Sequence, residues 1–99
     1  MKEFLIQRED KDFCVFHVDK FREVLQPNSI ESEKVDGWGD YRIRVDNSEI
    51  SFSFEMVGIQ ISFETGEISN EKAEGIMSEI CQKVEKEIKE SCNWIQISD

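Results

Sequence analysis

Two runs of alternating apolar and polar residues, separated by a glycine turn, constrain the fold of this chain more than any other feature. The stretch from Glu49 to Phe63 reads EISFSFEMVGIQISF. Apolar residues occupy every second position on either side of Met56-Val57-Gly58, which is the pattern of strands with one buried face. Glycine takes the positive φ that tight turns often require. The stretch therefore predicts a β-hairpin with one apolar face that another element must cover.

A long amphipathic helix after the hairpin is predicted to provide that cover. From about residue 70 to about 92, apolar side chains recur at three- and four-residue spacing, and Ser69 or Asn70 is placed to cap the amino end. Glu79–Lys83 and Glu85–Lys89 form favourable i,i+4 pairs along it. Gly75 lowers helix propensity, so we expect a close approach to a strand at that position. Cys81 and Cys92 fall on the apolar stripe, which predicts buried, unreactive thiols.

Further strands complete the predicted sheet. Residues 41–45 and 94–98 alternate strictly, residues 2–8 carry a short apolar run, and residues 30–35 can add a short edge strand. We therefore expect a single α+β domain over residues 1–99, with an antiparallel sheet of about five strands, the helix over about 70–92 packed on one face, and a short N-terminal helix. The opposite sheet face is expected to face solvent, and it carries Arg42, Arg44, Ser51, Ser53, Glu55, Gln60, Ser62 and Glu64.

Residues 13–18 leave two alternatives open. Their sequence FCVFHV is rich in residues that favour strands, which predicts a strand to Val18 that forms a hairpin with the first strand. A short helix from Asp19 to Gln26 then ends before Pro27. Alternatively, Asp12 caps a single helix that extends to Leu25, because the apolar residues also match helical spacing.

Composition and charge narrow the classes of partner. Hydrophobic residues make up 38% of the 99 residues, which is enough for a folded core, and the formal net charge is −10. Such a charge repels phosphate backbones and attracts cationic proteins, so direct nucleic-acid binding is not expected. Three cysteines without a paired spacing favour reduced thiols, and the first residues lack the apolar run of a signal peptide or a membrane span. We therefore expect a cytoplasmic protein without membrane contact.

The sequence contains no recognisable catalytic or metal-binding constellation. His17 is the only histidine, which excludes a multi-histidine metal site or a catalytic triad within one chain. On a strand Cys14 and His17 face opposite sides, whereas on a helix they share a face. Gly37 and Gly39 do not precede a helix as a phosphate-binding loop requires, and the Asp36–Asp40 loop offers too few ligands for calcium. We therefore expect no enzyme activity, no cofactor and no metal.

The loop Asp36-Gly37-Trp38-Gly39-Asp40 is the most distinctive local feature. A tryptophan between glycines can project as a recognition anchor, and surrounding acids suit a basic partner surface. Alternatively, Trp38 folds back to close the open end of the core.

In size, charge and α+β build, the whole chain resembles the small acidic immunity proteins that bacteria make alongside their own toxins. The resemblance rests on this general character and on no motif. It implies a non-enzymatic inhibitor that neutralises a basic toxin or nuclease by direct binding. The residues expected to meet such a partner are Glu31, Glu33, Asp36, Trp38, Asp40, Glu55 and Glu64. The alternatives are an assembly protein that forms a homodimer or larger oligomer through its sheet face or edge, and a phage-encoded inhibitor that mimics nucleic acid.

Overall fold

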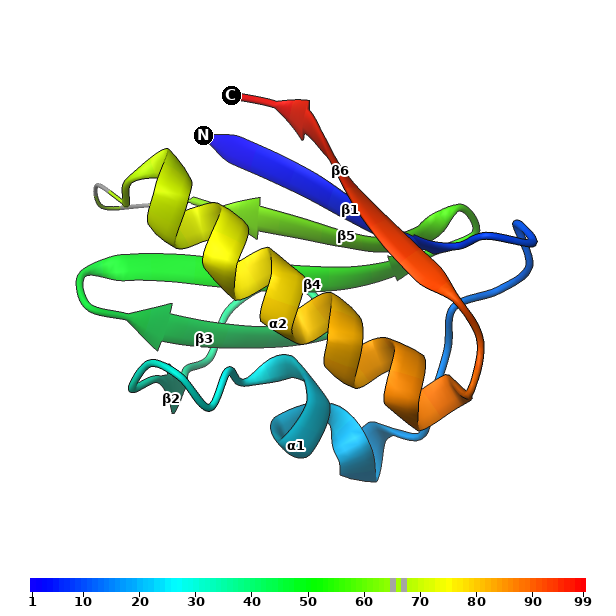
Figure 1. The fold of residues 1–99 in the computed structure, drawn as a ribbon. Coiled ribbons are helices and arrows are strands. Elements are labelled where there is room, and N and C mark those ends of the chain that lie inside the picture. The colour runs from blue at the N-terminus through cyan, green and yellow to red at the C-terminus, as the bar shows by residue number, and fades with distance from the viewer. Residues whose placement is uncertain (65, 67) are drawn as a thin grey trace.

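A six-stranded antiparallel sheet covered on one face by a long helix forms the framework of the protein (Figure 1). The structure is a computed structural model and describes residues 1–64, 66 and 68–99. The strand order is β2-β3-β4-β5-β1-β6. The elements are β1 (Lys2–Arg8), η1 (Val18–Lys20), α1 (Phe21–Leu25), β2 (Glu33–Lys34), β3 (Tyr41–Val45), β4 (Ser48–Glu55), β5 (Gly58–Phe63), α2 (Asn70–Ile88) and β6 (Cys92–Ser98). The α+β class, the long helix and the short N-terminal helix are confirmed.

The core lies where α2 crosses the inner faces of the central strands. In the predicted hairpin, Phe52 pairs with Ile61, and Glu55 pairs with Gly58 across the turn. Phe52, Ile61 and, from α2, Ile80 are 0% exposed. Burial of side chains of this size contributes about 1.5–3 kcal/mol each before the loss of conformational entropy is counted. The hairpin and its helical cover are therefore the main source of stability.

The first strand lies in the interior of the sheet, which overturns both alternatives for residues 13–18. β1 pairs with β5 on one side and with β6 on the other, so neither of its edges is free for a hairpin with residues 13–18. These residues form neither a strand nor a long helix, and regular structure begins only at Val18. Phe16 instead packs edge-on against Phe54 and Phe21. The short helix predicted over residues 19–26 forms as η1 and α1 and buries Phe21 as part of the core.

The long helix ends earlier than predicted. Ser69 caps its amino end by accepting a hydrogen bond from the Lys72 amide at 3.1 Å, as expected. Its last residue is Ile88, because Lys89 adopts the left-handed conformation with φ 59° and ψ 39°. Cys92 consequently belongs to β6 and not to the helical stripe. None of the helices in the described ranges has both the length and the apolar character needed to cross a membrane.

Two glycines show opposite constraints. Gly58 has φ 144°, and a Cβ at this position would lie 2.2 Å from the main-chain oxygen of Ile6 on β1. Gly75, by contrast, has no atom within 4 Å of such a Cβ, so the predicted close approach to a strand is wrong. Gly58 is required for close strand packing, whereas Gly75 only lowers the stability of α2.

We predict that Gly75→Ala raises the free energy of unfolding by about 1 kcal/mol, because alanine lowers the entropy of the unfolded chain and meets no obstacle in the helix. Gly58→Ala is the matched control and should be destabilising, because its methyl group meets the β1 backbone. Urea unfolding followed by circular dichroism measures both. A stabilised Gly58→Ala variant or a destabilised Gly75→Ala variant would contradict this assignment.

Candidate functional site

The loop between β2 and β3 crosses the outer sheet face, which we define as the face opposite α2. Asp40 fastens the loop to the end of β4, because its amide donates to the Phe52 oxygen at 2.8 Å and its carboxylate accepts from the Phe54 amide at 2.7 Å. Trp38 lies over the guanidinium of Arg42, 5.9 Å from ring centroid to Cζ, and is 60% exposed. Trp38 therefore neither closes the core nor projects freely into solvent, since it covers Arg42 with one face of its ring.

Arg42 is the centre of a buried ionic network beneath this loop. Its Nε donates to Glu49 at 2.7 Å and its Nη2 donates to Glu64, which also accepts from the Ser51 hydroxyl at 2.9 Å. The side chains of Arg42 and Glu64 are each 10% exposed. The hydrogen bond from Arg42 holds the pKa of Glu49 below its ordinary value of 4.5. Nη1 of Arg42 has no hydrogen-bond partner in the part of the chain that the structure describes.

This network corrects the expectation that the outer face is fully solvent-facing. Arg42, Ser51 and Ser62 are buried, at 9%, 1% and 3% exposure. Ser51 pairs with the longer Arg42 on β3, Ser62 pairs with the longer Glu3 on β1, and Gly39 of the Asp36–Asp40 loop approaches Ser51. The carboxylate of Glu64 is engaged inside the network, so it is not part of an accessible surface.

The remaining predicted binding residues fall into two separate groups. The first group is Asp36, Trp38, Asp40 and Glu55. Glu55 is the last residue of β4, next to Phe54, whose amide binds Asp40 of the loop. Glu31 and Glu33 lie toward the opposite end of β3, where Glu33 bonds to Arg44 at 2.8 Å. Asp36 and Glu55 are exposed, with Asp36 paired to Lys34 at 3.5 Å and Glu55 accepting from the Ser53 hydroxyl, whereas Asp40 has the structural role described above. The predicted residues therefore do not form one continuous site.

Four exposed apolar residues, which the sequence did not single out as a group, lie at the same end of the sheet as Glu55. We call Phe13, Val15, Met56 and Val57 the apolar end. Their exposed fractions are 54%, 57%, 78% and 65%. The first two belong to a segment that contacts β1 through Arg8 and β4 through Phe54, so this segment crosses the end of β5, which lies between those strands. The β4–β5 turn that carries Met56 and Val57 begins there.

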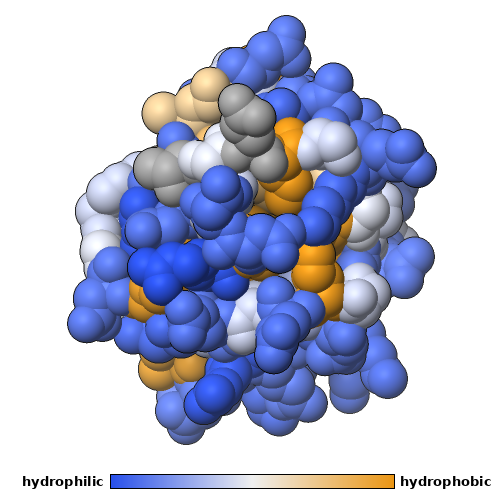
Figure 2. All heavy atoms as spheres, turned by 90° about the vertical axis from the view of Figure 1, so that its left-hand side faces the viewer, coloured by the Kyte–Doolittle hydropathy of each residue, from blue (hydrophilic) through white to orange (hydrophobic). Residues whose placement is uncertain are grey.

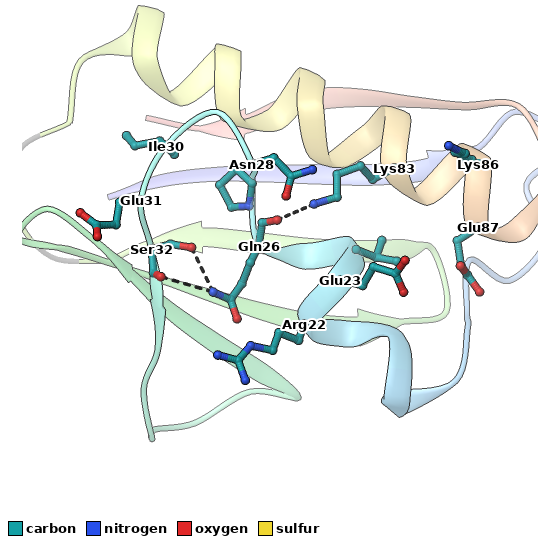
Figure 3. Close-up of a pocket in the computed structure, with 12 residues that line it drawn as sticks. Arg22, Glu23, Gln26, Asn28, Ile30, Glu31, Ser32, Lys83, Lys86 and Glu87 are labelled. Atoms are coloured by element: carbon teal, nitrogen blue, oxygen red, sulfur yellow. Dashed lines mark hydrogen bonds between the residues drawn. The ribbon is translucent and has the colours of Figure 1, made fainter.

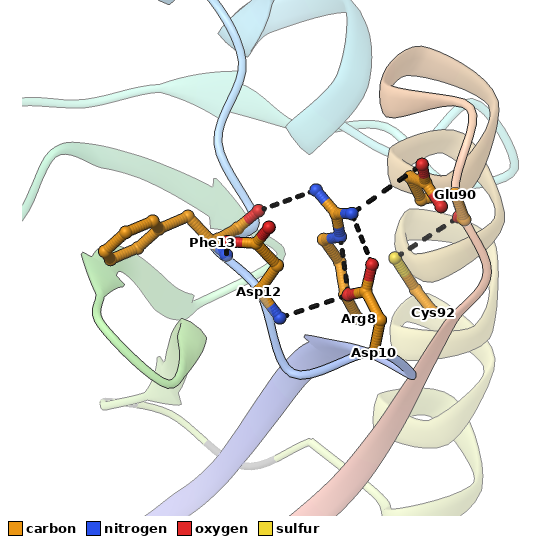
Figure 4. Close-up of polar contacts among 6 residues, drawn as sticks. All are labelled: Arg8, Asp10, Asp12, Phe13, Glu90 and Cys92. Atoms are coloured by element: carbon orange, nitrogen blue, oxygen red, sulfur yellow. Dashed lines mark hydrogen bonds and ion pairs between the residues drawn. The ribbon is translucent and has the colours of Figure 1, made fainter.

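Arg8 holds the segment that carries Phe13 in place (Figure 4). Its Nε donates to Asp10 at 2.9 Å, its Nη1 donates to the Phe13 oxygen at 3.3 Å, and Nη2 lies 3.6 Å from Glu90. The bond from Arg8 keeps the pKa of Asp10 below its usual range. Phe13 itself points away from α2, on the side of the β4–β5 hairpin. The positive charge of Arg8 is thus neutralised by Asp10 and Glu90.

The charge around the apolar end is predominantly negative. The acids next to it in the chain, or on the loop that Asp40 ties to β4, are Glu9, Asp10, Asp12, Asp36, Asp40 and Glu55. The cations of these stretches are fewer, namely Lys11, Arg8, which pairs with Asp10, and Lys34, which pairs with Asp36 at 3.5 Å. The opposite end of the molecule, with the β3–β4 turn and both termini, shows mostly hydrophilic side chains with a few apolar ones between them (Figure 2). Exposed apolar side chains are also found near the termini, where Met1 is 67% and Ile97 is 47% exposed. What characterises the apolar end is that four such residues lie near several acids.

All three cysteines come together in the core, although they are distant in sequence. Cys14, Cys81 and Cys92 are free and buried, and the thiols of Cys14 and Cys92 are within hydrogen-bonding contact. Burial raises the pKa of Cys14 and of Cys81 to about 12. No sequence pattern predicts this cluster, because the three residues meet only through the packing of three separate segments.

His17 and the potential metal ligands of the described residues are placed as follows. His17 is exposed and accepts a hydrogen bond from the Asp19 amide at 3.1 Å, so it caps η1 and does not pair with buried Cys14. Within residues 1–64, 66 and 68–99, no group of three potential ligands is placed to hold a metal ion.

A groove of about 710 Å³ lies between α1, the loop after it and the carboxyl half of α2 (Figure 3). Its charges are balanced between the cations Arg22, Lys83 and Lys86 and the acids Glu23, Glu31 and Glu87. Lys83 donates to the main-chain oxygen of Gln26, and the side-chain amide of Gln26 donates to the Ser32 hydroxyl at 3.1 Å. Because these polar groups bond to one another, the groove favours no class of ligand.

Comparisons of the chain with protein-family models, with curated proteins and with solved structures found no match.

We predict that Arg42→Met lowers the free energy of unfolding at pH 7 by about 3 kcal/mol, because it leaves the Glu64 carboxylate buried without its cation. The control is Arg44→Met on the same strand, which should cost less than about 1 kcal/mol because Arg44 is 42% exposed. Arg42 lowers the pKa of Glu49, so the stabilisation from this pair is lost as the pH falls through that lowered pKa, and the penalty for Arg42→Met should shrink below pH 4.5. Equal penalties for the two variants at pH 7 would contradict the buried network.

We also predict that the native protein resists alkylation by iodoacetamide at pH 8. With the pKa of Cys14 and Cys81 at about 12, only about one such thiol in ten thousand is ionised at that pH. Mass spectrometry should show all three cysteines labelled in denaturant and little labelling without it. Ser91→Cys supplies an exposed control thiol beside Cys92 that should react rapidly in the folded protein. Rapid native labelling of Cys14 would contradict its burial.

Proposed function

We propose that the protein is an acidic, non-enzymatic binding module that neutralises a basic protein, most simply a toxin or nuclease, by covering its cationic surface. The observation that carries this proposal is the apolar end with its surrounding acids. Exposed apolar side chains that gather in one place mark interaction sites more often than isolated ones do. A basic partner would meet both the apolar contact area and the charge that it needs.

The two properties of this surface have different roles in binding. The net charge of −10 speeds the approach of a cationic protein over long distances. Met56, Val57 and Phe13 then supply apolar area that leaves water on contact, which slows dissociation. Trp38, with Asp36 beside it in the chain, extends the surface along the outer sheet face. A cytoplasmic location, where thiols stay reduced, fits the three free cysteines and is part of the proposal.

The first test identifies the partner by its dependence on the apolar end. The wild-type protein and a Met56→Lys/Val57→Lys double variant serve as baits in cells of the source organism, and quantitative mass spectrometry compares what each retains. We expect a basic protein to be depleted at least about tenfold from the double variant, because charge in the contact area prevents desolvation. If no basic protein distinguishes the two baits, the proposal is wrong.

The second test uses that purified partner in stopped-flow association measurements. Asp36→Lys and Glu55→Lys should each slow association several-fold at low salt and by much less at high salt, because salt screens the steering field. Two control variants make the same charge change elsewhere: Glu31→Lys in the other group of acids, and Glu74→Lys at an exposed position of α2. Equal slowing by all four variants would show that the overall charge matters and that the apolar end is not the site.

A further inference from the structure

The two edges of the sheet differ sharply in how well they are protected. β2 forms one edge and contains only Glu33 and Lys34, both charged and exposed, which is a common way to prevent strand addition. β6 forms the other edge, spans Cys92–Ser98 and contains no charged residue. We propose that β6 is a pairing site for a second copy of this chain, which joins two sheets into one across a two-fold axis.

The backbone geometry shows which groups of β6 are available. The Glu9 amide donates to the Ser91 oxygen at 2.9 Å, which places this pair among the hydrogen-bonded pairs of the β1–β6 ladder. Hydrogen-bonded and non-hydrogen-bonded pairs alternate in an antiparallel ladder. The pairs Arg8–Cys92, Ile6–Trp94 and Phe4–Gln96 are therefore non-hydrogen-bonded. The main-chain groups of Cys92, Trp94 and Gln96 consequently point away from β1.

One of these outward amides already has a partner, which supports the assignment. The Cys92 amide donates to the Glu85 carboxylate at 2.9 Å, outside the β1–β6 ladder. Trp94 and Gln96 lie farther along the strand, and no strand of the described chain pairs with β6 on that side. The register of the β1–β6 pair shifts between Glu3 and Phe4, beyond Gln96. The regular part of the open edge therefore includes Trp94 and Gln96.

The side chains of β6 favour burial on its outer face. Ile95 and Ile97 are 44% and 47% exposed, and Ile95 pairs with Leu5 of β1. If Trp94 pairs with Gln96 of the second copy, the two-fold axis passes midway between the two copies of Ile95, which then pack against each other. Both outward residues of each strand then exchange main-chain hydrogen bonds with the other copy.

The distribution of charge favours a second copy over a cationic strand as the occupant. An uncharged strand gives a basic partner no electrostatic advantage, whereas two chains of charge −10 repel each other least where neither carries charge. In the register above, Asp99 lies opposite Ser91 of the second copy, so no acids face each other across the pair. This pairing uses a different surface from the apolar end and does not depend on the proposed function.

Sedimentation velocity over a range of protein and salt concentrations tests the proposal. We expect a monomer–dimer equilibrium whose dissociation constant falls several-fold between low and high salt, because salt screens the repulsion between the copies. A protein that stays monomeric up to about 1 mM at high salt overturns the proposal, since that concentration corresponds to only weak binding. A dimer weakened by salt overturns it as well.

Gln96→Pro is the decisive variant, with Gln96→Ala as its matched control. Both lose the side chain, but only proline removes the outward amide, and edge strands tolerate proline at such a position. We expect Gln96→Pro to weaken the dimer at least tenfold relative to Gln96→Ala. Equal dimerisation by the two variants overturns the proposal.

A second pair of variants covers the case in which Gln96→Pro does not fold. Ile95→Lys places a charge at the two-fold axis and should abolish dimerisation, whereas Val57→Lys makes the same change at the apolar end and should leave it intact. Circular dichroism establishes that each variant is folded. If Val57→Lys loses the dimer and Ile95→Lys keeps it, pairing through β6 is overturned and dimerisation is assigned to the apolar end.

Discussion

The burial of one face of the sheet beneath α2 is the constraint on which the rest of the structure depends. The core residues of β1, β4 and β5 and the inner stripe of α2 are almost completely excluded from water. Every functional feature described here lies outside this core, on the outer face, at the ends of strands or along an edge. The core therefore fixes the positions of surfaces to which it contributes no side chains of its own.

Most of the charge acts at the surface, but some of it is used for tertiary contacts. Glu79, predicted to pair with Lys83 along α2, accepts hydrogen bonds from Asn28 and Ser29, while Lys83 donates to the Gln26 oxygen. Glu85, predicted to pair with Lys89, accepts from Cys92. Main-chain donors and acceptors without partners in a connecting segment compete successfully with an exposed ion pair, which contributes only tenths of a kcal/mol. These side chains fasten the connections to α2.

The surface divides into regions with different physical properties. The apolar end combines exposed apolar side chains with acids, which suits a cationic protein. The β6 edge combines unpaired main-chain groups with an absence of charge, which suits a like-charged copy. The Arg42 network lies beneath the Asp36–Asp40 loop, and its acids Glu49 and Glu64 are engaged with Arg42.

Sequence alone determined the elements whose patterns are local. Alternation over residues 41–63 and helical spacing after residue 70 each depend on neighbours along the chain, so the central hairpin, β3 and the start of α2 were predicted correctly. Only the tertiary structure decided the place of β1 between β5 and β6, the absence of a strand at Phe13–Val18, the meeting of the three cysteines and the burial of Glu64. Each of these depends on which distant segments compete for the same edge or the same space. A local pattern contains no information about that competition.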